Sequence, residues 1–243
     1  GIPGASLCSL GRQQSPVAID SFQGIIGGGD ELPPLRWDCG GVSPCGSRRG
    51  ATSQAQQLFD GHYFAVQNFA ADGPPKLKLD GLDYVLDALH FHTPSEHTLG
   101  GKYFDMEMQM MHTGPGGRRA VVSVLMQTDA GAAGPAWLTS LVSAIAPCHL
   151  SPDHVDCRLS AAPAALAPGF AFPQIAATVE PLLNHYFRYQ GSLTSPPCTE
   201  DVAWVVVRTP VEVAQDDWTA VAALEGKNNR PLQPLHGRVV RWV

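Results

Sequence analysis

The stretch "HFHTPSEHTLGGKYFDMEMQMMHT", residues 90–113, carries the alternation of side chains that decides the fold. It overlaps the alternating segment "YVLDALHFH" (84–92) and contains the whole of a second one, "FDMEMQMMH" (104–112). A period of two is typical of a β-strand, and the residues "LGGK" between the two segments favour a turn. We therefore predict two strands joined through a turn.

The two faces of these strands differ in chemistry. His90 and His92 stand at i and i+2, so both imidazoles project from one face of the first strand. On the second strand, Glu107 and Gln109 share one face with Met111, opposite a face that comprises Met106, Met108, Met110 and His112. One polar face of the sheet is therefore expected to carry the chemistry.

The rest of the chain indicates a mainly β protein with few helices. Short apolar segments alternate with turn signals about every ten residues, as in an antiparallel sheet or sandwich. The segments 119–127 and 201–213 are expected to form continuous buried strands. Helical spacing of apolar residues, or an acidic start, predicts helices over 136–145, 173–183 and 216–224.

The composition limits the classes of partner that are expected. The 243 residues carry a net charge of −6 without a run of Lys or Arg, so nucleic acid and anionic membrane surfaces are not expected partners. Apolar runs such as "AWVVV" (203–207) are far too short to span a bilayer. The sequence starts at Gly1 without a Met or a charged-then-apolar leader, so any targeting peptide is expected to have been removed or to lie outside this sequence. One large all-β domain fits this length better than two small ones.

Six cysteines without a C-x-x-C motif favour disulfides over a thiolate metal site. An oxidising compartment is therefore expected. Two pairs flank short, turn-rich loops and two further cysteines remain, although six cysteines permit 15 pairings and the spacing does not decide among them. The flanking pairs are Cys39 with Cys45 and Cys148 with Cys157, and the remaining residues are Cys8 and Cys198.

Two histidines on one strand face could bind one metal ion, although an H-x-H pair alone is common among ordinary histidines. Glu96 completes H-x-H-x3-E, which also begins the first metal motif of cupins, but no second cupin motif follows at a suitable spacing. Metallo-β-lactamases need H-x-H-x-D-H, and Pro94 and Ser95 occupy the places of the Asp and the His.

Three further motifs distinguish between these families. Taken with "HFHTPSEH" (90–97), the segments "QQSPVAI" (13–19), "GSLTSPPCTEDVAW" (191–204) and "NNRPLQPL" (228–235) resemble α-class carbonic anhydrases, most closely bacterial, plant and algal members. The resemblance extends to "RVV" (238–240). It implies a single domain over 1–243, built on a large central, mostly antiparallel β-sheet with peripheral short helices. It also implies zinc-dependent hydration of CO2 to bicarbonate.

The same resemblance assigns roles to individual residues. His90 and His92 match the first two zinc ligands, but Gln109 stands where the family has its third histidine. Glu96 and Thr194 match the catalytic pair that orients the attacking oxygen, and His62 matches the proton shuttle. Supporting positions are the partners Glu107 and His97, the pocket residues Met111, Val121, Leu193, Ser195 and Trp204, and the disulfide pair Cys8 and Cys198.

Two departures from the family weaken the expected zinc site. Zinc with three imidazoles lowers the pKa of a water from 15.7 to about 7, but an amide oxygen is a weaker ligand than imidazole. Glu107 could accept a hydrogen bond from the Gln109 amide nitrogen and so turn the amide oxygen toward the metal. Ala88 replaces a glutamine common in the family, so His90 lacks one partner.

Two functions therefore compete. The first is CO2 hydration at a weakened His/His/Gln zinc site, where Thr194 donates its only proton to Glu96. The second is a catalytically inactive relative with a structural, storage or binding role, whose protein partner the sequence does not identify. The expected location is oxidising: secreted, periplasmic, extracellular or an organelle lumen such as the thylakoid lumen.

Overall fold

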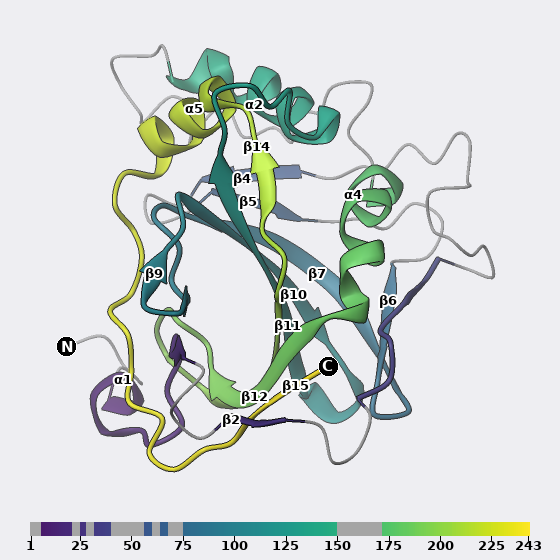
Figure 1. Ribbon diagram of the computed structural model, residues 1–243, viewed down its shortest axis with the longest axis vertical. Helices are drawn as coiled ribbons and strands as arrows, with labels where there is room; N and C mark the ends of the chain where they lie inside the picture. Colours follow the sequence, from purple (N-terminus) through teal and green to yellow (C-terminus); the bar gives the residue numbers. More distant parts are fainter. Residues whose placement is uncertain are drawn as a thin grey trace.

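The structure is a computed structural model. It describes residues 6–20, 25–27, 32–39, 56–59, 64–67, 75–149 and 172–243. It confirms a mainly β fold with short helices at the periphery (Figure 1). Within the described residues, no helix is both long and apolar enough to cross a membrane.

A twelve-stranded sheet forms the centre of the molecule (Figure 1). Its main path runs β2 (Ile25–Gly27), β15 (Val240–Trp242), β12 (Tyr186–Ser192), β13 (Glu200–Val207), β11 (Arg119–Thr128), β10 (Met106–Thr113), β7 (Leu82–His92), β5 (Phe64–Gln67) and β4 (Gln56–Phe59). Three short strands join beside this path: β3 (Trp37–Asp38), β6 (Lys76–Leu79) and β14 (Val211–Val213). Most pairs are antiparallel, but β11–β13, β11–β14 and β15–β2 are parallel, so the sheet is mixed.

The "LGGK" turn lies in a second, three-stranded sheet of β1 (Ala18–Ile19), β8 (Thr98–Leu99) and β9 (Lys102–Tyr103). Gly100 and Gly101 have φ values of 58° and 74°, which glycine adopts without a steric penalty. The chain therefore leaves β7, forms this small hairpin, and returns as β10 beside β7.

The prediction of one continuous strand over 201–213 is wrong, because two strands occupy this range. β13 ends at Val207 and β14 begins at Val211, although both pair in parallel with β11. Pro210 lacks the N–H that a ladder requires. The N–H of Arg208 turns instead to the His185 carbonyl, at 3.0 Å.

All three predicted helices are present, with altered ends. They are α2 (Ala136–His149), α4 (Phe172–Val179) and α5 (Gln215–Glu225), besides the short α1 (Ser6–Leu10) and the 3₁₀ turns η2 (Pro115–Gly117) and η3 (Glu180–Asn184). The expected helix over 173–183 changes to η3 after Val179, because Pro181 cannot continue an α-helix. Helices α2 and α5 pack together at one end of the sheet (Figure 1).

β10 separates two apolar clusters, as its alternation predicts. Met106, Met108 and Met110 lie in the larger cluster, with α2, α4 and α5. Val121 and Trp204 belong to the smaller cluster on the other side of the sheet. The polar face of β10 is therefore enclosed, and only 2% of Gln109 is exposed.

His112 is buried on the methionine side of β10 as a neutral hydrogen-bonding residue. Its Nδ1 donates to the Met110 carbonyl at 2.8 Å, and its Nε2 accepts from Trp37 Nε1 at 3.1 Å. Burial lowers the pKa of His112 from 6.5 to about 4. This histidine therefore serves packing and not metal binding.

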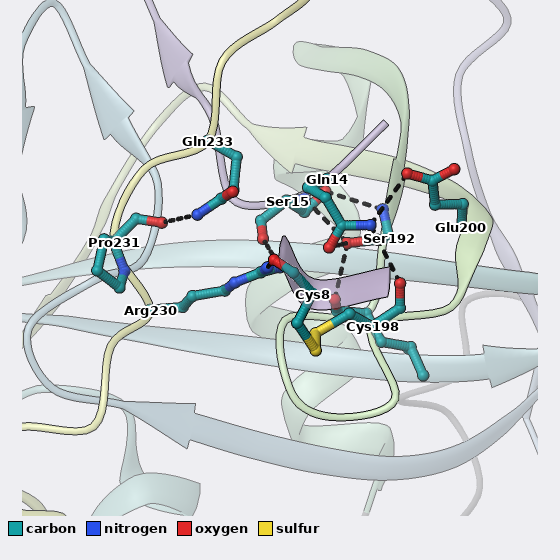
Figure 2. The surroundings of a disulfide bond; sticks show 10 residues. Cys8, Gln14, Ser15, Ser192, Cys198, Glu200, Arg230, Pro231 and Gln233 are labelled. Atoms are coloured by element: carbon teal, nitrogen blue, oxygen red, sulfur yellow. Dashed lines mark hydrogen bonds between the residues drawn. A yellow bond between two sulfur atoms is a disulfide. The ribbon is translucent and has the colours of Figure 1, made fainter. Parts of the chain in front are cut away.

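A disulfide joins Cys8 and Cys198 across 190 positions of sequence, which confirms the pairing that the family resemblance implied (Figure 2). Cys39 is also disulfide-bonded. The side chains of Cys45, Cys148 and Cys157 lie outside the described part, so the two short-loop pairs remain predictions.

We predict that His112 makes stability fall with acid. Its pKa is lower in the folded than in the unfolded protein, so the unfolded chain takes up the proton first. The associated stability is complete above pH 6.5 and is lost as the pH falls toward about 4. Between about pH 7 and about pH 5, the free energy of unfolding measured in urea should fall by about 2 kcal/mol more for wild type than for His112→Gln. Equal losses in the two proteins would contradict this role.

We also predict that removing the long-range disulfide destabilises the fold. Cys8→Ser should lower the free energy of unfolding by about 2–4 kcal/mol, since the cross-link restricts the unfolded chain. Urea unfolding measures the change, and Leu10→Ala, at a position of α1 whose side chain is 76% exposed, is the control. A loss no larger than that of the control would show that the tether contributes nothing.

Candidate functional site

Strands β7 and β10 bring the predicted polar face together. Their antiparallel register places His92 opposite Glu107 and His90 opposite Gln109. Directly opposed residues project from the same face of a sheet. Two imidazoles, one carboxylate and one amide therefore share one small region, as the alternation predicted.

His92 is the most conspicuous member of this group. Only 8% of its side chain is exposed, yet both ring nitrogens are buried without a hydrogen-bond partner. The nearest carboxylate oxygen, Glu96 Oε1, lies 3.7 Å from Nδ1, which is beyond hydrogen-bond distance. Buried polar groups are almost always satisfied, so two open nitrogens on one ring indicate a place for a ligand. His90, on the same strand face, is half-buried.

Gln109 is fixed by two carboxylates. Its Nε2 donates to Glu96 Oε2 at 2.7 Å and to Glu107 Oε1 at 3.1 Å. Carboxylates only accept hydrogen bonds, so the NH2 end of the amide must face them. Both N–H groups are then used, and the amide oxygen points away from the carboxylates. The bond to Glu107 was anticipated from strand parity, whereas the bond to Glu96 was not.

Glu107 is fully buried and accepts from several donors. Its Oε2 accepts the backbone N–H of Glu96 at 2.9 Å and of His97 at 2.8 Å, and its Oε1 lies 2.9 Å from His97 Nδ1 and 2.8 Å from the Ser123 hydroxyl. Burial raises the pKa of Glu107, but the charge and hydrogen bonds of His97, with the Ser123 hydroxyl, outweigh it and lower the pKa to about 2. Glu107 is therefore a carboxylate at neutral pH.

His97 extends the hydrogen-bond network from Glu107 away from the polar face of β10. Its Nε2 lies 2.7 Å from the Tyr189 hydroxyl, which lies 2.8 Å from Ser15 Oγ. Burial raises the pKa of Tyr189 well above 10.0, so the phenol stays protonated. The Trp204 ring packs against His97 with centroids 4.8 Å apart. Both polar ends of His97 are thus satisfied, which fits a supporting residue and not a ligand.

Glu96 accepts at both oxygens. Besides Gln109 on Oε2, the backbone N–H of Arg230 donates to Oε1 at 2.8 Å. Thr194 is half-buried, and its hydroxyl makes no hydrogen bond to any residue that the structure describes. The expected donation from Thr194 to Glu96 is therefore missing from the described contacts, and Oε2 accepts from Gln109.

The loop that carries Thr194 is tied to the N-terminal segment (Figure 2). Gln14 Nε2 donates to the Cys198 carbonyl at 3.2 Å, next to the disulfide. The Arg230 guanidinium donates to the carbonyls of Ser15 at 2.6 Å and of Cys8 at 2.8 Å (Figure 2). Arg230 thus links the N-terminal segment to the Glu96 carboxylate.

The predicted apolar pocket residues gather beside the polar face. Val121 and Trp204 are buried in the smaller cluster, and Met111 and Leu193 pack against it. Val121 pairs with Met111 on one side and Trp204 on the other. Ser195 is half-buried, and its carbonyl accepts the N–H of Cys198 at 2.9 Å. His62 and its shuttle role lie outside the described residues.

The sequence reasoning named neither Arg230 nor Tyr189 nor Ser123 as site residues. Arg230 stands within the quoted motif "NNRPLQPL", which could have drawn attention to it. Tyr189 and Ser123 lie on β12 and β11, within ordinary alternating or apolar strands. No local signal marks either residue.

The residues fit a weak metal centre better than a strong one. Within the described chain, no three His, Cys, Asp or Glu side chains form a group that could hold a metal ion. His90 and His92 would need the amide oxygen of Gln109 as the third ligand. The open nitrogens of His92 and the fixed direction of the amide agree with this set.

Comparison with known proteins identifies the family. The family model described as eukaryotic-type carbonic anhydrase matches residues 4–243. A carbonic anhydrase of Pectobacterium atrosepticum is 29% identical over 239 residues, which cover 98% of this chain and 83% of that protein.

Two solved structures share the fold. The α-carbonic anhydrase of Thermovibrio ammonificans, in complex with the inhibitor sulfanilamide, aligns with a TM-score of 0.75 and 27% identity, covering 98% of this chain and 91% of that one. A dioscorin complexed with ascorbate aligns with a TM-score of 0.73 and 27% identity, covering 99% and 89%. Because the family model spans nearly the whole chain, the chain belongs to the eukaryotic-type carbonic anhydrase family.

Proposed function

We propose that the protein catalyses the reversible hydration of CO2 to bicarbonate and a proton, at a zinc site weakened by Gln109. The observation that carries this proposal is the buried ring of His92, whose two nitrogens have no hydrogen-bond partner. A metal ion is the simplest group that would satisfy a ring nitrogen there. Family membership supplies the reaction class.

The ligands would be His90, His92 and the amide oxygen of Gln109. Zinc bound by these residues would supply hydroxide near neutral pH. The amide nitrogen is already held by Glu96 and Glu107, which leaves the amide oxygen free of both carboxylates and able to face a metal. The buried negative charge of Glu107 also favours a cation nearby.

The remaining residues would bind the substrate and move the proton. The apolar wall of Met111, Val121, Leu193 and Trp204 suits CO2, which has no charge and no net dipole. His62 would pass the product proton to buffer, because an unperturbed imidazole titrates near 6.5. The Cys8–Cys198 disulfide is compatible with our proposal of an oxidising compartment.

A second candidate is a binding role without catalysis. It is favoured by the Gln109–Glu96 hydrogen bond of 2.7 Å, which occupies the carboxylate that Thr194 would use in hydration. The dioscorin structure, a member of the same fold, is a complex with ascorbate. In this reading the cleft would bind a small organic molecule, and weak zinc would be incidental.

We predict substoichiometric zinc in protein purified without chelator. The loss of affinity should be at least the ~10–100-fold that removal of a supporting partner of a ligand costs. Elemental analysis before and after dialysis against a chelator measures it. Full occupancy that resists the chelator would contradict the weak-ligand account.

We predict that Gln109→His restores a tight zinc site and raises CO2 hydration at least ~10–100-fold over wild type. The imidazole would lie opposite His90 with Glu107 beside it to accept its N–H. Stopped-flow hydration with one equivalent of zinc checks the rate, and Gln127→His on β11 controls for an added surface imidazole. Ala88 remains unchanged, so full family efficiency is not expected.

Two outcomes would reject parts of this account. If Gln109→His binds zinc fully but hydrates no CO2, the cleft itself is inactive and the binding role is favoured. If wild type is already as active as the variant, Gln109 is not the weak point.

A further inference from the structure

Glu96 accepts hydrogen bonds from two described donors, and the Thr194 hydroxyl is not one of them. Gln109 Nε2 donates to Oε2 at 2.7 Å, and the Arg230 backbone N–H donates to Oε1 at 2.8 Å. The Glu96 side chain is 1% exposed, so water does not compete for these oxygens. One acceptor position on each oxygen is taken, by the Gln109 amide on Oε2 and by a backbone N–H on Oε1.

The number of N–H groups on residue 109 decides which carboxylates it reaches. A carboxamide has two, and Gln109 gives one to Glu96 and one to Glu107. A neutral imidazole has only one N–H, so a ligating histidine at this position could serve Glu107 alone. Glu96 Oε2 would then be open to another donor.

Thr194 is the hydroxyl affected by this difference. A threonine hydroxyl has one proton, and when a carboxylate holds that proton, its oxygen can only accept hydrogen bonds from a ligand. Here Thr194 is half-buried and donates to no described residue. Its proton is therefore available to a ligand in the cleft.

We propose that Gln109 is a positioning residue that uncouples Thr194 from Glu96. One side chain thereby weakens the third metal ligand and also releases the hydroxyl that should orient the attacking oxygen. Thr194 changes from an obligatory acceptor into a donor, which favours ligands that present an acceptor atom. This inference deepens the proposed function, since it concerns the same cleft.

The test is the thermal stability of metal-free protein, which needs no catalytic activity. Thr194→Val should shift the Tm of wild type by less than about 1 °C, because no hydrogen bond is lost. In the Gln109→His background the same change should lower the Tm by about 3–10 °C, the effect of losing a hydrogen bond to a carboxylate. Thr194→Ser should retain the stability there, because it keeps the hydroxyl.

A matched threonine calibrates the measurement. Thr128 is also half-buried, and its hydroxyl donates to Asp105 Oδ2 at 2.8 Å. Thr128→Val should lower the Tm by about 3–10 °C in both backgrounds, because Gln109 does not touch it. Gln109→Met, of similar length but without N–H groups, provides a second background in which Glu96 is released.

The outcomes separate this inference from the proposed activity. Equal Tm losses from Thr194→Val in wild type and in both Gln109 variants would overturn it, and so would the absence of a loss in every background. With saturating zinc, Thr194→Val should slow hydration by more than about tenfold in Gln109→His and by a smaller factor in wild type. An inactive wild type would defeat the proposed function while the Tm comparison still decides this inference.

Discussion

The buried carboxylate of Glu107 is the interaction on which the site depends. It joins β10 to Ser123 on β11 and to the backbone of Glu96 and His97, the segment that follows β7. A carboxylate without solvent is tolerable only when it is paired and fully hydrogen-bonded. The charge of His97 and these donors meet that requirement, as the pKa of about 2 reflects. Replacing any one donor would therefore disturb the positions of the others.

Local periodicity predicted much of this arrangement. Strand parity placed His90 and His92 on one face and Gln109 beside Glu107, and antiparallel pairing brought the two strands into register. The apolar pattern also overestimated the length of the strand predicted over 201–213. It does not show that the hydrogen-bonded pairing is interrupted near Pro210. The pairing of Cys8 with Cys198 came from family resemblance and not from spacing.

The contacts of Glu96 could not be predicted from the sequence. Glu96 lies after the end of β7, where no period fixes the direction of a side chain. Its partner Arg230 is 134 positions away, and its partner Gln109 is 13 positions away on another strand. Only the return of the chain through the small hairpin of β8 and β9 brings Gln109 within reach. That Gln109 bonds to a second carboxylate depends on this three-dimensional path.

Hydrogen bonds and a disulfide between distant segments surround the polar face of β10. Arg230 reaches the Cys8 and Ser15 carbonyls, the disulfide fixes Cys198, and Asn228 donates to the Phe91 carbonyl at 3.1 Å next to His92. The Gln109 side chain takes no part in these contacts. The Gln109 amide in turn satisfies the two carboxylates from the inside. The contacts that join these segments are therefore separate from those of the Gln109 amide, so a change of residue at position 109 is expected to leave them in place.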